Sequence, residues 1–153
     1  MNKQPNSRMC FVCGVENHAG LHVKFYDDGK EKVFIEHIIA DHHQGYPGVA
    51  HGGIVAAILD EVGGRVVMIN NPMRLFMTMK LEVKYRAAVP VGKPIKAVGW
   101  LIKDKGKLAT AHAEIRLPDD TILAEAELLL TEPPDTVFTI SDADQLGWKV
   151  YED

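Results

Sequence analysis

Apolar and polar residues alternate along most of the chain, a pattern typical of strands that bury one face. Residues 20–27 and 33–40 flank an Asp-Gly pair, which predicts a hairpin turn between two strands. Residues 95–103 and 108–117 predict a second hairpin, and residues 121–130 predict a further strand. Residues 75–85 alternate most clearly, with apolar side chains of one parity and polar side chains of the other: Leu75, Met77, Met79, Leu81, Val83 and Tyr85 against Thr78, Lys80, Glu82 and Lys84.

Residues 52–70 have a different pattern, with neither strand alternation nor proline. The segment is long enough for about five helical turns. Nearly every side of such a helix is apolar or small, which indicates burial on most sides. The sequence therefore predicts an α+β fold in which five or six antiparallel strands wrap around one long central helix.

The composition and length suit one globular domain, with 153 residues of which 46% are hydrophobic and 25% charged. A net charge of -4 shows no excess of basic residues of the kind that binds nucleic acid. No apolar run is long enough to predict a membrane span. The N-terminus has no apolar leader, so we expect a cytoplasmic protein.

Three parts are expected along the chain: an N-terminal segment at residues 1–20, the main domain at residues 21–131 and an acidic tail at residues 132–153. In the tail, Ser141 precedes Asp142 and Asp144, which favours a short helix with Ser141 as its N-cap.

The sequence His51-Gly52-Gly53 opens the predicted helix. Backbone N–H groups at a helix start have no partner within the helix, and the positive end of the helix dipole lies there. Glycine also lets a ligand approach the backbone closely, so this segment is a candidate oxyanion site. The alternative explanation for the two glycines is that they only allow a tight backbone turn at the start of the helix.

Asp60 is the candidate catalytic carboxylate. Its neighbours three and four residues away are alanines and glycines, so no cation lies within helical reach. Glu61, by contrast, has Arg65 four residues later, and we expect these two to form a surface ion pair. An unpaired carboxylate on a small-residue face is costly unless it is hydrogen-bonded or used, although a position at the helix rim would also explain it.

One helix cannot bring Gly52 and Asp60 to the same reacting atom. They are eight residues apart, or about 12 Å at 1.5 Å per residue. Reacting groups must come within about 3–3.5 Å. Two chains with antiparallel helices could combine Asp60 of one with Gly52 of the other, so we expect a two-fold homodimer.

The segment HGGIVAAILD, with an acid nine residues after the histidine, resembles the hotdog-fold acyl-CoA thioesterases. The similar subgroup is the phenylacetic-acid-type (PaaI-like) branch, which shares features with 4-hydroxybenzoyl-CoA thioesterases. The opening CFVCGVENHAGLHVKF and the strand TMKLEVKY, followed by VPVG, are also similar. The resemblance runs from about residue 10 to residue 130.

This resemblance implies a hotdog fold, homodimers or dimers of dimers, and active sites at the dimer interface. It implies hydrolysis of an acyl-CoA thioester, with coenzyme A as part of the substrate and no cofactor. Gly52 then resembles the backbone oxyanion donor, and Asp60 the acid that acts as nucleophile or general base. Thr78 resembles a hydroxyl that orients the carboxylate or water, with an ordinary strand threonine as the alternative.

Several residues near the helix start are candidates for substrate contacts. Some relatives carry Asn or Gln six residues before the histidine, where this chain has Gly45, so Gln44 or His43 would have to replace it. Gly53 offers a second amide. We expect His51 to bond nearby backbone, with a general-base role as the lesser alternative.

Three cations of one parity, Lys80, Lys84 and Arg86, are candidates for the coenzyme A phosphates. A solvated strand face would explain them equally.

The N-terminal segment contains C-x2-C-x4-H-x3-H, formed by Cys10, Cys13, His18 and His22. These are four ligands with the close spacing of a zinc knuckle. The similar family keeps the cysteines without the histidines, so we expect two free thiols and no metal.

Two other functions fit the same residues. A hotdog dehydratase or hydratase pairs a histidine and an acid at a different spacing. A non-catalytic acyl-CoA sensor is the alternative from another class, although a pure binder has no need of an unpaired Asp60.

Overall fold

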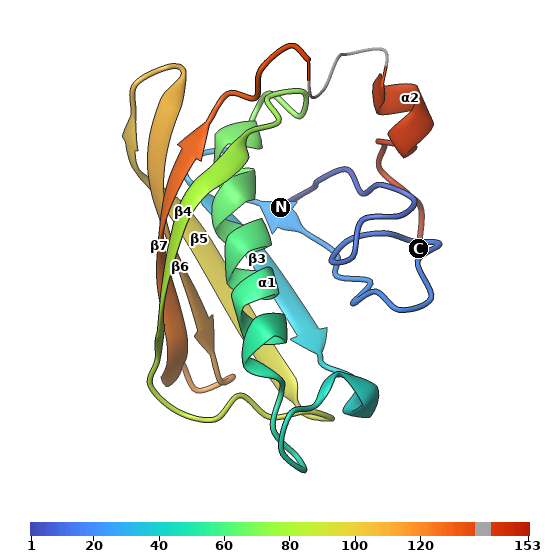
Figure 1. The fold of residues 1–153 in the computed structure, drawn as a ribbon, viewed down its shortest axis with the longest axis vertical. Helices are drawn as coiled ribbons and strands as arrows, with labels where there is room; N and C mark the ends of the chain where they lie inside the picture. Colours follow the sequence, from blue (N-terminus) through green and yellow to red (C-terminus); the bar gives the residue numbers. More distant parts are fainter. Residues whose placement is uncertain (137–141) are drawn as a thin grey trace.

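The computed structural model describes residues 1–136 and 142–153, and its centre is helix α1 (Gly52–Gly64). A seven-stranded sheet curls around this helix, and all its neighbouring strands pair antiparallel. The strand order is β1-β2-β3-β5-β6-β7-β4. Figure 1 shows α1 running along the inner face of the sheet. This is the α+β hotdog arrangement that the sequence predicts.

Five of the six predicted strands are present over nearly their predicted lengths, whereas the strand predicted over residues 20–27 is reduced to the two residues Tyr26–Asp27. The sheet is wider than the expected five or six strands because two-residue strands extend it beyond β3. The bounds are β1 Asn2–Lys3, β2 Tyr26–Asp27, β3 Lys32–Ile38, β4 Met77–Tyr85, β5 Pro94–Asp104, β6 Leu108–Arg116 and β7 Ile122–Thr131.

The central helix ends earlier than predicted. It begins at Gly52, but after Gly64 the chain tightens into the 3-10 helix η2 (Arg65–Met68), so the expectation of one helix over residues 52–70 was wrong. Glycine is a poor helix former, and two in succession weaken the helix at this point. A second 3-10 helix, η1 (Asp41–His43), lies in the loop before α1.

The core lies between α1 and the sheet. The helix buries Val55, Ile58, Leu59 and Val62 against the strands. The contact is close, because a Cβ at Gly63 would lie 2.5 Å from a methyl group of Leu128. The small residue therefore fixes the distance between helix and sheet.

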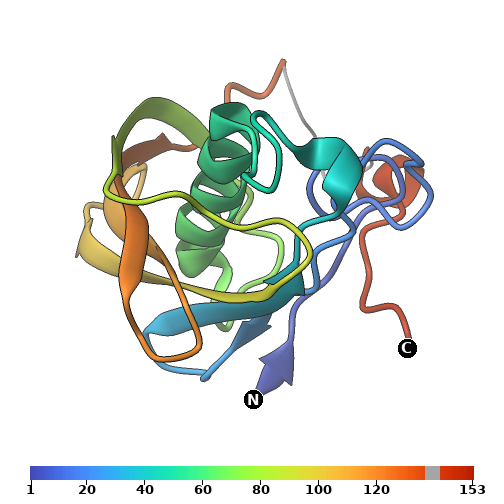
Figure 2. The same cartoon turned by 90° about the horizontal axis from the view of Figure 1, so that it is seen from below.

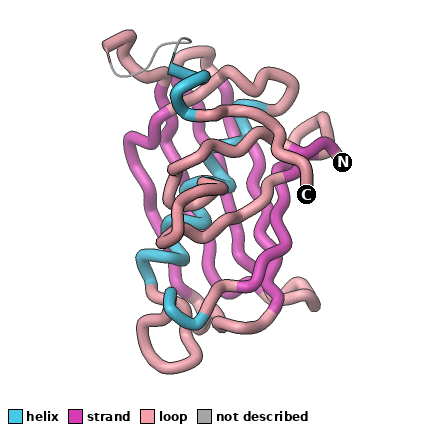
Figure 3. The backbone as a smooth tube through the Cα atoms, turned by 90° about the vertical axis from the view of Figure 1, so that its right-hand side faces the viewer, coloured by secondary structure: helices cyan, strands magenta, loops and turns pink. Residues whose placement is uncertain are grey.

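The two ends of the chain cover the side of α1 that the sheet leaves open (Figures 2 and 3). They also bind each other: the backbones of Asn6 and Lys149 form a β-bridge, and the Arg8 amide donates to the Leu146 carbonyl over 2.8 Å. The tail contains the short helix α2 (Asp142–Leu146). Its expected N-cap, Ser141, lies outside the described residues.

Among the described residues, none of the helices has the length and apolar character needed to cross a membrane.

Candidate active site

Asp60 and Thr78 form the centre of the candidate site. Asp60 lies on the second half of α1 and is half-buried. Thr78, on edge strand β4, donates its hydroxyl hydrogen to Asp60 Oδ1 over 2.6 Å. Because this bond holds one carboxylate oxygen, it fixes the rotamer of the acid.

A β-bulge turns Thr78 toward the helix. Thr78 pairs with Leu130 and Lys80 pairs with Leu129, which leaves Met79 as an extra residue between them. Because of this extra residue, the side chains before it lie on the face opposite to the one that strict alternation would give them. Thr78 therefore shares the inner face with Leu81, and its predicted place on the polar face was wrong. Met77 correspondingly leaves the inner face.

The start of α1 holds the candidate oxyanion donor. His51 is the N-cap residue, and its Nδ1 accepts the Gly53 N–H over 2.9 Å. This ring contact agrees with the expected structural role of His51. It also occupies the Gly53 amide, which sequence reasoning assigned to substrate. Among the described residues, the Gly52 amide has no acceptor.

A hollow of about 260 Å³ opens beside Gly52. The Tyr85 hydroxyl donates to the Gly52 carbonyl over 2.7 Å and so ties the end of β4 to the first turn of α1. Sequence reasoning missed this role of Tyr85. The available signal was that Tyr85 is the only aromatic residue of β4 and falls on its inner face. The lining residues are Val49, Ala50, Gly52, Val55, Tyr85, Arg86, Ala87, Ala88 and Val89.

The loop before the helix uses its polar side chains internally. Gln44 Oε1 accepts the Gly48 amide over 3.4 Å, and His43 Nε2 lies 2.9 Å from the Ala19 carbonyl oxygen. A Cβ at Gly45 would lie 3.3 Å from Cα of His51, so this glycine permits close packing on the helix entry. In this single chain, neither Gln44 nor His43 is directed to the Gly52 amide.

The three candidate phosphate-binding cations do not gather at one point. Arg86 lines the hollow beside Gly52 and binds the Glu125 carboxylate over 2.8 and 3.1 Å. Lys80 lies further along the edge strand, is 71% exposed, and is 3.9 Å from Glu82. Lys84 is exposed on the same outer face.

A larger hollow of about 1020 Å³ lies over strands β2, β3 and β5, and Lys32, Phe34, Lys96 and Trp100 are among its lining residues. Its lining does not include Asp60, Thr78 or Gly52, so the two parts of the candidate catalytic machinery lie elsewhere.

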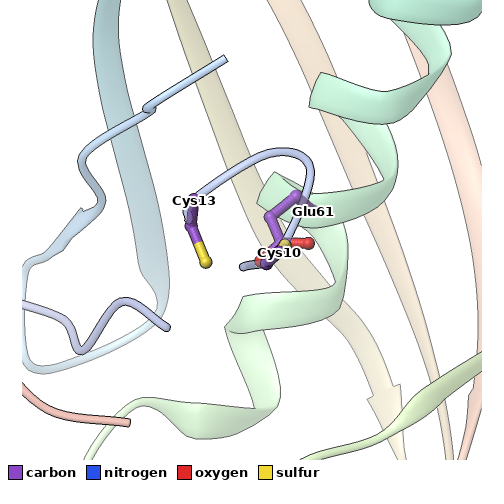
Figure 4. A group of neighbouring side chains, drawn as sticks. All are labelled: Cys10, Cys13 and Glu61. Atoms are coloured by element: carbon purple, nitrogen blue, oxygen red, sulfur yellow. The ribbon is translucent and has the colours of Figure 1, made fainter. Parts of the chain in front are cut away.

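The cysteines lie together without the histidines. Both thiols are free, and His22 instead contacts the Asn17 carbonyl. The Cys10 thiol donates to the Cys13 sulfur, which raises the pKa of Cys10 far above its usual value and lowers the pKa of Cys13 to about 6. Glu61 of α1 completes the group (Figure 4).

Comparisons with known proteins place this geometry in a family. A family model described as thioesterase superfamily matches residues 47–124, which include α1 and β4. The chain belongs to the thioesterase superfamily. The acyl-coenzyme A thioesterase THEM4 of Rattus norvegicus is 24% identical over 122 residues, which are 79% of this chain and 52% of the relative. The chain thus spans about half the length of that relative.

Solved structures agree with this membership. One thioesterase superfamily protein is 28% identical with a TM-score of 0.71, over 81% of this chain and 63% of its own. Zebrafish thioesterase superfamily member 2 is 17% identical with a TM-score of 0.68, over 78% and 88%. The protein smu.793 of Streptococcus mutans, bound to acetyl CoA, is 17% identical with a TM-score of 0.64, over 71% and 86%. The last two show the fold alone.

Proposed function

We propose that the protein hydrolyses acyl-CoA thioesters at sites formed between two copies of the chain. The observation that carries this proposal is the hydrogen bond from Thr78 to Asp60, on a helix whose first amide, at Gly52, is open. The relatives support the substrate class, since rat THEM4 is an acyl-coenzyme A thioesterase and smu.793 binds acetyl CoA.

The distance along α1 supports a site shared by two chains. Asp60 and Gly52 are eight residues apart, or about 12 Å along the helix, while reacting groups must approach to about 3–3.5 Å. Strand β4 is the edge of the sheet, with Met77 and Met79 45% and 62% exposed. An open edge strand pairs readily with another strand. Pairing of two β4 strands about a two-fold axis would cover these methionines and set the two α1 helices antiparallel.

In the proposed reaction, the Gly52 N–H of one chain donates to the thioester oxygen as negative charge develops on it. In one route, Asp60 of the other chain attacks the carbonyl carbon, coenzyme A leaves as thiolate, and water hydrolyses the mixed anhydride. In the second route, Asp60 takes a proton from water, which attacks directly. Both routes consume one water and yield the acid and the thiol, and Thr78 holds the reacting carboxylate in place.

Substrate contacts follow from the same arrangement. Arg86 lies in the hollow beside Gly52 and can meet a phosphate if it leaves Glu125, while Lys80 and Lys84 extend positive charge along β4. From the sequence signature around HGG we further propose that the protein belongs to the PaaI-like branch, with coenzyme A present only as part of the substrate.

A second candidate function is acyl-CoA binding without turnover. The observation that favours it is Gly45, which has no side chain to supply a second oxyanion donor, together with a Gln44 amide that faces its own loop. This alternative predicts tight binding of acyl-CoA and no hydrolysis.

The test compares the purified protein with its Asp60→Asn variant on aryl-, short-chain and long-chain acyl-CoAs. Thioester absorbance is followed directly, because Cys10 and Cys13 would react with a thiol dye. We expect turnover in the parent and a loss of at least about a hundredfold in the variant, with unchanged oligomer size and acyl-CoA affinity. Binding without turnover in both proteins would favour the sensor, and equal turnover would contradict the role of Asp60.

A further inference from the structure

We propose that Cys10, Cys13 and Glu61 bind a zinc ion that ties the N-terminal segment to α1, one residue from Asp60. Sequence reasoning weighed a zinc site that used His18 and His22 and favoured free thiols without metal. The structure replaces the two histidines with a carboxylate from a segment 48 residues further along the chain.

The geometry suits a small thiophilic cation. The two sulfurs and a Glu61 carboxylate oxygen all lie within 4.8 Å of one another. Figure 4 shows the cysteines on the N-terminal loop and Glu61 reaching the same space from α1. At usual zinc bond lengths, the ligands of a tetrahedral ion lie about 3.6–3.8 Å apart. Side-chain adjustments of about 1 Å or less would therefore close the site around the ion.

The loop that carries the two thiols is already shaped. The Gly14 amide donates to the Cys10 carbonyl over 2.8 Å, and Asn6 Nδ2 donates to the Cys13 carbonyl over the same distance. The Ser7 hydroxyl accepts the Cys10 amide over 3.1 Å. A Cβ at Gly14 would lie 2.3 Å from the Cys10 carbonyl oxygen, so the turn requires glycine there. The ligands are thus ordered before the ion binds, which reduces the entropic cost of binding.

The surroundings provide a partner that orients the carboxylate. Arg65 Nε donates to Glu61 Oε1 over 3.0 Å, and the Arg65 side chain is only 1% exposed. Among the described residues, Glu61 Oε2 has no hydrogen-bond partner and is available to a metal. Ligating carboxylates are commonly held in this way by a hydrogen-bonded neighbour. Two thiolates and one carboxylate carry three negative charges, which one divalent ion and the Arg65 guanidinium neutralise.

The ligand set selects the metal. Thiolate ligands favour zinc over magnesium or calcium, which take oxygen. Three protein ligands leave a fourth position for water. The proposed role is structural: the ion would hold residues 1–25 against α1 and is independent of the thioesterase proposal.

The first experiment measures metal content in the full chain, purified under reducing conditions without chelator. We expect about one zinc per chain, and cobalt(II) added after removal of zinc should produce a thiolate-to-metal charge-transfer band in the near ultraviolet. X-ray absorption of the zinc form should show two sulfur neighbours at about 2.3 Å and lighter atoms at about 2.0–2.2 Å. Less than about 0.1 zinc per chain, with no cobalt band, would overturn the proposal.

Variants identify the ligands. Cys13→Ser should weaken the charge-transfer band, because one of the two thiolates is lost. Glu61→Gln should retain the band at saturating cobalt and weaken zinc binding more than about tenfold, since even loss of an orienting partner costs 10–100-fold. The matched control is the double variant His18→Ala/His22→Ala, which should bind zinc as the parent does. Three results would contradict the site. The first is loss of zinc from the histidine variant, and the second is unchanged zinc affinity in Glu61→Gln. The third is a Cys10–Cys13 disulfide that forms in freshly reduced protein and excludes zinc. The absorption spectrum of the parent protein tests the ligand set even if Cys13→Ser fails to fold.

Discussion

Thr78 Oγ1 lies 2.6 Å from Asp60 Oδ1. This contact exists because β4 carries one extra residue, Met79, between Thr78 and the regular part of the strand that starts at Lys80. Without the bulge at Met79, strand alternation would place the Thr78 hydroxyl on the opposite face of the sheet from α1. The contact joins the edge strand to the second half of the central helix, so any movement of the edge would move the carboxylate.

The first prediction concerns the Thr78 hydroxyl. Thr78→Val keeps the side-chain shape and removes the donor, so kcat should fall about 10–150-fold, the equivalent of losing about 1.5–3 kcal/mol from a hydrogen bond to a charged group. Thr78→Ser is the matched control and should retain most of the activity. Steady-state kinetics on the preferred acyl-CoA checks both variants, and equal rates in Thr78→Val and the parent would show that the hydroxyl is not needed.

The second prediction tests whether each site uses two chains. Gly52→Pro removes only the candidate oxyanion donor, because proline is accepted at the first helical position and His51, with φ -58 and ψ 138, already has the conformation that precedes proline. Activity should fall about 10²–10³-fold. Gly52→Ala is the control, since it keeps the amide and its Cβ would lie 3.6 Å from Tyr85.

Mixing then distinguishes the two arrangements. Chains with Asp60→Asn and chains with Gly52→Pro are combined, unfolded and refolded together. If sites are shared, each mixed dimer regains one intact site, so activity should recover to about a quarter of the parent value when half of the dimers are mixed. No recovery in mixed dimers that are shown by mass spectrometry to form would place both groups of a site on one chain.

The third prediction concerns pH and stability. Burial, together with the nearby His43 and His22, holds the pKa of His37 below its usual 6.5. The unfolded chain therefore takes up this proton at higher pH than the folded chain does, and the free energy of unfolding should fall as the pH drops below about 6.5. His37→Gln should reduce this slope in urea unfolding measured between pH 5 and 8. An unchanged slope would assign the effect to other groups.

The sequence predicts the layers of this fold better than its local irregularities. Hydrophobic alternation places the strands, and the uninterrupted apolar run places the helix, because both patterns depend on local periodicity. The bulge at Met79 breaks that periodicity without a glycine or proline to mark it, so parity gave Thr78 the wrong face. HGG and the acid nine residues later indicated Gly52 and Asp60, whereas the contact of Glu61 with Cys10 and Cys13 depends on how the N-terminal segment crosses the helix.

The burial of Arg65 could not be predicted from local pattern either, and it leads to the last prediction. Its spacing from Glu61 predicts an ion pair, which the structure confirms at 3.0 Å, but the sequence favours a surface pair while the side chain is only 1% exposed. Pro5 accepts a hydrogen bond from it over 2.7 Å, and its guanidinium lies 3.9 Å from the ring centroid of Phe25. Both contacts come from the chain before β2, whose crossing of α1 no local pattern encodes.

Arg65→Ala should therefore lower the free energy of unfolding by about 3–5 kcal/mol, since it leaves the Glu61 carboxylate without its cation and opens a space beneath the segment. Arg74→Ala is the matched control: Arg74 also binds a carboxylate, that of Asp104, over 2.6 Å, but both side chains are partly exposed. An exposed pair contributes about 1 kcal/mol or less, so the control should be mild. Similar losses in urea unfolding of the two variants would contradict a special role for the buried arginine, because the surface pair differs from it mainly in exposure.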